Sequence, residues 1–240
     1  MQDVIHLPGP NADRLLVLCD HGSDRVPPDL DLGIPREAFS EHIAVDLGAL
    51  AVAKGVAEAQ GAPLLHPAWS RLVIDMNRAP EDPAGIPSVS DERAIPGNTD
   101  LSTVAISRRH ALHNAYHDAI SLRLDETTPD LMLSVHSFTP RLKSGGQRPW
   151  QAGLLYDQDA RAARIAIAAL EADGLTVGDN EPYDGGRFGY TMQRHAEPRG
   201  IPYLFLEIRQ DLLSTADGQA EWAQRVSNLV DTVLTKLPDA

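Results

Sequence analysis

The chain has 240 residues and a formal net charge of −13, with 42% hydrophobic and 23% charged residues. These values are typical of a globular protein, and the length predicts one domain over residues 1–240. The acidic charge argues against a nucleic acid or an anionic membrane as partner, because both need a basic surface. One cysteine, Cys19, and no apolar run of membrane-spanning length predict a cytoplasmic protein without an internal disulfide.

Apolar runs of strand length alternate with helical segments along the chain. We expect strands that begin at Leu15 and that cover 63–66, 71–75, 131–136, 153–156 and 201–208. We expect helices over 46–60, 103–126, 159–173 and 218–237, the second capped by Ser102 or Asp100. Prolines predict an irregular segment over 79–100, and 139–150 is expected to be a basic flap. The alternation indicates a three-layer α/β/α sandwich with a mixed, largely parallel central sheet.

A polar turn carrying His21 and Asp24 follows the first expected strand. An imidazole and a carboxylate at the end of a buried strand can bind a metal ion, and Zn²⁺ accepts both ligand types. The same pair also fits a histidine that bonds a backbone carbonyl beside an aspartate that caps a turn. The turn is therefore a candidate metal site with a structural alternative.

His136 ends a second apolar strand, as His21 follows the first. Catalytic zinc takes three protein ligands and leaves one position open. We therefore expect His21, Asp24 and His136 to form a metal-binding set. The alternative for His136 is a core histidine that bonds a neighbouring strand.

Glu207 ends the apolar run 203–206, where an unpaired carboxylate is costly to bury. One interpretation is a general base for the water that attacks the substrate beside the metal. The other is a buried ion pair with Arg209 or another arginine. Two histidine-ended strands nearby in the expected sheet favour the base.

Arg71, Asn77 and Arg78 surround the strand expected at 71–75. A guanidinium can hold a carboxylate in a bidentate manner, and an adjacent amide adds a donor. The alternative for each arginine is a surface ion pair, since the chain is rich in acidic residues.

Three histidines, His110, His113 and His117, lie on the helix expected at 103–126. The last two share a face, but Asn114 stands where the glutamate of an H-E-x-x-H zinc motif would be. We therefore expect these histidines to lie on a solvated face of the helix.

These motifs, in this order, resemble the N-formylglutamate amidohydrolase family over about Leu15 to Leu213. The resemblance rests on His21-x-x-Asp24, Ser70-Arg71-x-x-x-Asp75-x-Asn77-Arg78, Val135-His136-Ser137, Asn180-Glu-Pro-Tyr183, Gly189-Tyr190-Thr191 and Leu206-Glu207-Ile-Arg209-Gln-Asp211. That family is similar in fold to the zinc carboxypeptidases, with a mixed eight-stranded sheet flanked by helices.

The resemblance implies a role for each candidate residue. His21, Asp24 and His136 would hold Zn²⁺, and Glu207 would be the general base. Asn77 and Arg78 would grip the α-carboxylate, and Arg71 would polarise the scissile carbonyl or bind a second carboxylate. Arg209, Tyr190 and His195 would complete the substrate pocket.

The implied activity is zinc-dependent hydrolysis of a small acidic N-acyl amino acid, above all N-formyl-L-glutamate, to formate and glutamate, as in histidine degradation. One alternative is a zinc carboxypeptidase or another N-acyl-amino-acid hydrolase, which would need a more open cleft. A second is a non-catalytic protein that binds small anions, which would need no metal.

Overall fold

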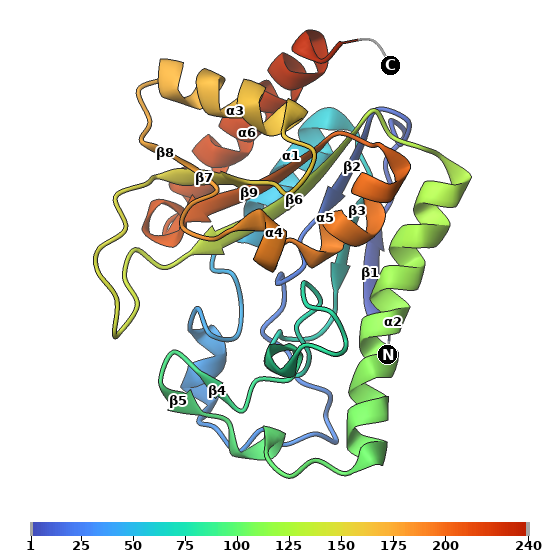
Figure 1. Cartoon of the computed structure of the whole chain (residues 1–240), viewed down its shortest axis with the longest axis vertical. Coiled ribbons are helices and arrows are strands. Elements are labelled where there is room, and N and C mark those ends of the chain that lie inside the picture. Colours follow the sequence, from blue (N-terminus) through green and yellow to red (C-terminus); the bar gives the residue numbers. More distant parts are fainter. Residues whose placement is uncertain (1, 239–240) are drawn as a thin grey trace.

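A mixed seven-stranded sheet forms the centre of the computed structural model, which describes residues 2–238 (Figure 1). The strands lie in the order β1-β3-β2-β6-β9-β7-β8. Their bounds are β1 Val4–Leu7, β2 Leu15–Leu18, β3 Leu64–Pro67, β6 Leu131–Phe138, β7 Ala152–Leu155, β8 Val177–Asp179 and β9 Tyr203–Arg209. The mixed sheet is as predicted, although it has one strand fewer than the resemblance implies.

The four central strands, β3, β2, β6 and β9, run parallel to one another. β1 is antiparallel to β3, and β7 is antiparallel to β9. The carboxyl ends of the central strands therefore meet at one edge of the sheet, where α/β proteins usually build their sites. In Figure 1 the irregular segments of the first half of the chain gather beyond this edge.

Helices cover both faces of the sheet (Figure 1). α1 (Ala49–Gln60), α3 (Arg161–Ala172) and α6 (Ala216–Lys236) pack on one face, against side chains such as Leu133 and Leu206. α2 (Thr103–Glu126) and α5 (Tyr190–His195) share a second core with Met132 and Phe205, from the opposite face. Neighbouring residues of each strand alternate between the two cores because side chains alternate along a strand. The predicted three-layer sandwich is confirmed.

Local signals mark the helix termini, and the predicted Ser102 cap is confirmed. The Ser102 hydroxyl accepts a hydrogen bond from the Ala105 amide at 3.2 Å and caps α2. Gly61 ends α1 with a φ of 62°, a conformation that glycine adopts at little cost. α1 begins at Ala49 rather than at Asp46, because Gly48 has a φ of 79° and interrupts the helical backbone.

The strand predicted at 71–75 is wrong. This segment is buried but forms turns, and it pairs with no strand in the described chain. Side chains satisfy its carbonyls instead: Asn98 donates to Leu72 at 2.8 Å, and Arg109 donates to Val73 at 3.1 Å. An apolar run alone cannot distinguish a strand from such a segment.

The remaining segments are short. The irregular segment at 79–100 is confirmed, and it carries the small hairpin of β4 (Val89–Ser90) and β5 (Arg93–Ala94). The short helices are α4 Gly185–Phe188 and the 3₁₀ turns Arg36–Ser40, Pro83–Gly85, Pro96–Asn98, Glu197–Arg199 and Gln210–Leu213. The edge strands β1 and β8 were not predicted.

Among the described residues, no helix combines the length and the apolar character that a membrane span requires.

Candidate active site

Three central strands bring predicted site residues to the carboxyl edge of the sheet. His21 follows β2, while His136 of β6 and Glu207 of β9 are partners in register. All three side chains are buried. They border a cavity of about 110 Å³, which the predicted residues Arg71, Asn77 and Arg78 also line.

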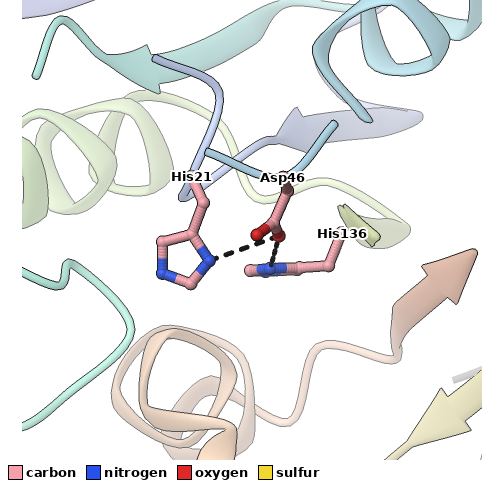
Figure 2. A group of neighbouring side chains, drawn as sticks. All are labelled: His21, Asp46 and His136. Atoms are coloured by element: carbon pink, nitrogen blue, oxygen red, sulfur yellow. Dashed lines mark hydrogen bonds and ion pairs between the residues drawn. The ribbon is translucent and has the colours of Figure 1, made fainter. Parts of the chain in front are cut away.

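The two histidines share one carboxylate, that of Asp46 (Figure 2). Asp46 Oδ2 lies 2.8 Å from Nδ1 of His136 and 3.3 Å from Nδ1 of His21. One potential ligand atom from each residue lies within 4.8 Å of the others. The loop before α1 is held in place because the Asp46 amide donates to the His21 carbonyl at 3.1 Å.

Two further carboxylates engage the other nitrogens of the two imidazoles. Nε2 of His21 lies 2.7 Å from Asp75, and Nε2 of His136 lies 2.9 Å from Asp20. Asp20 also accepts a hydrogen bond from Tyr116 at 2.7 Å. A carboxylate on one nitrogen fixes the tautomer and turns the other nitrogen toward the shared point, as in metal sites.

The donor set fits a divalent cation by its charge. The buried carboxylates of Asp20, Asp46 and Asp75 carry three negative charges, and Arg71 pairs with two of them, at 3.2 Å from Asp46 and 2.7 Å from Asp75. With both imidazoles neutral, as metal ligands must be, two negative charges would remain for a cation to compensate. Without a cation, a proton on His136 takes up part of this charge: burial alone would lower the pKa of His136, but hydrogen bonds to Asp20 and Asp46 raise it to about 10. Imidazole nitrogen and carboxylate oxygen suit zinc.

The structure does not bring Asp24 into this group. Its side chain is exposed, and Asp46 supplies the carboxylate between the histidines. The turn buries the preceding residue, Ser23, whose hydroxyl donates to the Ala68 carbonyl at 2.7 Å, and Asp24 faces outward. Asp46 was missed because its place before an alanine-rich segment indicated only the start of a helix.

One oxygen of the buried Glu207 carboxylate has no hydrogen-bond partner in the described chain. The Glu207 side chain is 5% exposed, and this oxygen, Oε2, has no hydrogen-bond donor among residues 2–238. Burial raises the pKa of Glu207 to about 7, against the lowering effect of His136. The alternative ion pair with Arg209 does not form, because Arg209 pairs with Asp211 at 2.8 Å. Arg209 does not line the cavity, contrary to its expected substrate contact.

Arg78 is the guanidinium best placed to receive an anion. It lies over the Phe188 ring, 4.4 Å from the ring centre, and no described carboxylate is within ion-pair distance of it. Arg71, in contrast, is bound to Asp46 and Asp75. Arg78 can therefore accept a substrate carboxylate, while Arg71 holds the two aspartates that contact His21.

Tyr190 and His195 do not line the cavity. The His195 ring bonds His117 at 2.8 Å, and the Tyr190 ring centre lies 5.3 Å from that of His117. His113 and His117 are fully buried, so the solvated face predicted for them is wrong. The buried side of α2 is polar and hydrogen-bonded, and the sequence pattern therefore lacks the apolar stripe of a packed helix.

Tyr183 is a cavity residue that residue-by-residue analysis did not single out, although it lies in the Asn180–Tyr183 motif. Its hydroxyl accepts a hydrogen bond from Arg148 at 3.0 Å. Burial, with the Glu207 carboxylate, raises the pKa of Tyr183, so the hydroxyl keeps its own proton. That proton is available to an acceptor in the cavity.

A buried carboxylate beside a group able to hold a metal, at the carboxyl edge of a parallel sheet, is the arrangement of a hydrolase. The sequence model of the N-formylglutamate amidohydrolase family matches residues 13–214. The chain belongs to this family and is a hydrolase of the amidohydrolase type.

Two solved structures are similar to this chain over nearly their whole length. A gene product of Agrobacterium tumefaciens is 33% identical, with a TM-score of 0.94 over 100% of this chain and 97% of its own. The N-formylglutamate amidohydrolase of Ralstonia eutropha is 20% identical, with a TM-score of 0.70 over 99% of this chain and 98% of its own, and it shares the fold. No curated protein gives a significant sequence match.

Proposed function

We propose that this protein is a zinc-dependent amidohydrolase that converts N-formyl-L-glutamate and water to formate and glutamate. The observation that carries the proposal is the buried Glu207 carboxylate, whose Oε2 lacks a hydrogen-bond donor among residues 2–238 and which lines a small cavity beside the His21–Asp46–His136 group. The family and the name of the Ralstonia enzyme support the choice of substrate.

His21, Asp46 and His136 would hold the zinc, the histidines through Nδ1. When bound, zinc would polarise the acyl oxygen and make the attacking water more acidic. Asp20 and Asp75 would orient the two imidazoles through Nε2. These three protein ligands are the number found in catalytic zinc sites, which keep one position open.

Glu207 would act as general base and then as general acid. It takes a proton from the water while the water oxygen bonds to the acyl carbon, and it returns this proton to the nitrogen as the carbon–nitrogen bond breaks. A pKa of about 7 suits both roles at neutral pH, because the group can hold and release the proton with little penalty.

Arg78 would hold the α-carboxylate of the substrate, and Tyr183 would donate its hydroxyl proton to a substrate oxygen. The cavity volume of about 110 Å³ favours a formyl group and a small amino acid over a peptide chain. Within this proposal the reaction would be the one expected in histidine degradation, and the single cysteine, Cys19, supports a reducing compartment such as the cytoplasm.

The test is formate release from N-formyl-L-glutamate by the purified, zinc-loaded protein. We expect N-formyl-L-glutamate to be cleaved with a higher kcat/KM than N-acetyl-L-glutamate or a dipeptide ending in glutamate. Faster cleavage of the dipeptide would favour the carboxypeptidase alternative. Binding of glutamate without turnover of any compound would favour the anion-binding alternative.

A further inference from the structure

One face of α2 carries a buried polar stripe made of Arg109, His113, Tyr116 and His117. Arg109 is 3% exposed and the other three side chains are 0% exposed. Their spacing places them on one side of the helix, because residues three and four apart share a face. A helix face that is polar and fully buried must find its partners inside the protein.

Two of these side chains hold the main chain on either side of Asn77. Nε2 of His117 lies 2.9 Å from the Met76 carbonyl, and Nε2 of His113 lies 2.9 Å from the Arg78 carbonyl. A carbonyl only accepts hydrogen bonds, so each Nε2 carries the proton. The segment has no regular secondary structure, and without these donors its carbonyls would be buried and unpaired.

The opposite side of the same segment is held by the Asn77 side chain. Its amide donates to the Phe188 carbonyl at 2.7 Å, and its oxygen accepts from the Thr191 amide at 2.9 Å. Asn77 therefore serves the fold more than the substrate. Residues 76–78 are fixed from α2 on one side and from α4 and α5 on the other.

The histidines are themselves locked in place. Nδ1 of His117 accepts from Nε2 of His195 at 2.8 Å, because its own Nε2 already carries a proton. The His113 ring centre lies 4.3 Å from that of His117 and 5.7 Å from that of Tyr190. These four rings therefore have little freedom to move. The Arg78 guanidinium extends toward the cavity from the main chain of residues 76–78, which they help to hold in place.

We propose that His113 and His117 are positioning residues, which hold the carbonyls on both sides of Asn77 and thereby direct the Arg78 guanidinium to the carboxylate of the substrate. This inference rests on the proposed function in one respect, the carboxylate that Arg78 is to bind. It assigns a role in substrate binding to two histidines that contact neither the substrate nor the metal-binding group.

The main variants are His113→Phe, which keeps a ring but removes the donor, and His113→Gln, whose amide can replace Nε2. His110→Phe on the same helix is the matched control, because His110 contacts neither carbonyl. The readouts are KM and kcat for N-formyl-L-glutamate, the calorimetric Kd for L-glutamate, and the melting curve of each variant.

We expect His113→Phe to raise KM and the glutamate Kd about tenfold, because a displaced binding group loses alignment, with kcat changed less than about twofold. His113→Gln and the control should stay within about twofold of wild type. In an Arg78→Ala background, His113→Phe should raise KM and the glutamate Kd by less than about a further twofold, because both substitutions remove the same interaction with the carboxylate. Should His113→Phe fail to fold, His117→Asn loses the Met76 bond but keeps the His195 bond, and it should behave in the same way.

Unchanged KM and Kd in a folded His113→Phe or His117→Asn protein would overturn the inference. Full additivity with Arg78→Ala would overturn it as well, since it would show a general structural effect. If wild type binds glutamate but cleaves nothing, the proposed function fails, and the inference is then tested by the glutamate Kd of the variants alone. If wild type neither binds glutamate nor cleaves substrate, both fail.

Discussion

At the scale of single residues, hydrogen-bond partners distinguish four carboxylates that are all buried. Asp20, Asp46 and Asp75 are each bound by a histidine or by Arg71, and their pKa values are lowered although burial alone would raise them. Glu207 is equally buried, lacks such a hydrogen bond on Oε2, and its pKa is raised. The three aspartates therefore stay charged, while Glu207 can exchange a proton near neutral pH.

Replacing Glu207 by glutamine should remove the proton acceptor without disturbing the metal-binding group. We expect kcat to fall by about 10²- to 10⁴-fold, the usual contribution of a general base. The zinc content should stay at the wild-type level, because Glu207 is not in the His21–Asp46–His136 group. The measurement is formate release with zinc content determined on the same sample.

Glu171→Gln, at an exposed position on α3, is the matched control and should keep the wild-type kcat. A Glu207→Gln protein with normal zinc content and normal kcat would contradict the role of Glu207.

At the scale of elements, α2 supports the site through buried neutral histidines. Burial lowers the pKa of His117 to about 3, with further lowering by His113 and His195. Burial and Arg194 lower the pKa of His195 to about 4. In the unfolded chain both histidines take up a proton near pH 6.5. Below that pH the unfolded state binds more protons, so acid destabilises the fold through this cluster.

Each such histidine should remove about 1.4 kcal/mol of unfolding free energy per pH unit below about 6.5, until the folded pKa is reached. When the pH is lowered from 7 to 5.5, we expect the unfolding free energy of His117→Gln to fall by about 1 kcal/mol less than that of wild type. The measurement is urea unfolding at both pH values in the presence of a chelator.

His110→Gln, at a partly exposed position on the same helix, is the control: its unfolding free energy should fall by as much as that of wild type between pH 7 and pH 5.5. An equal loss in His117→Gln and in wild type would show that His117 is not held neutral in the folded state.

The elements also show what sequence alone could predict. The strands β2, β6 and β9 and the long helices have apolar runs or capping residues that mark them locally. His21, His136 and Glu207, which line one cavity, could be singled out as candidates because they end or follow such strands. The segment at 71–75 was misjudged because distant side chains, Asn98 and Arg109, satisfy its carbonyls. Asp46 and the α2 histidines act through contacts far apart in sequence, so no local pattern marks them.

At the scale of the whole molecule, the candidate metal-binding group of His21, Asp46 and His136 joins parts of the chain that are far apart in sequence. His21 follows β2, Asp46 precedes α1, and His136 lies in β6. A metal at this point would crosslink the centre of the sheet to the loop before α1. Because a ligand that binds only the folded state stabilises it, metal binding should raise the stability of the entire protein.

Zinc at about 1,000 times its Kd should add about 4 kcal/mol to the unfolding free energy. For a chain of this size, that corresponds to a rise in Tm of about 8–16 °C. The measurement is thermal unfolding with zinc and with a chelator. A Tm that does not respond to zinc would mean that the group is closed by its own hydrogen bonds and binds no metal.

The measurement that tests the account most directly is the zinc content of the purified protein beside Asp46→Asn and Asp24→Asn. We predict about one zinc per chain in wild type and in Asp24→Asn, because catalytic zinc sites hold one ion with three protein ligands and Asp24 is exposed. Asp46→Asn should lose most of the zinc, because it removes the carboxylate that His21 and His136 share. Full zinc content in Asp46→Asn together with loss in Asp24→Asn would contradict the site described here, and no zinc in any of the three proteins would contradict the proposed hydrolysis.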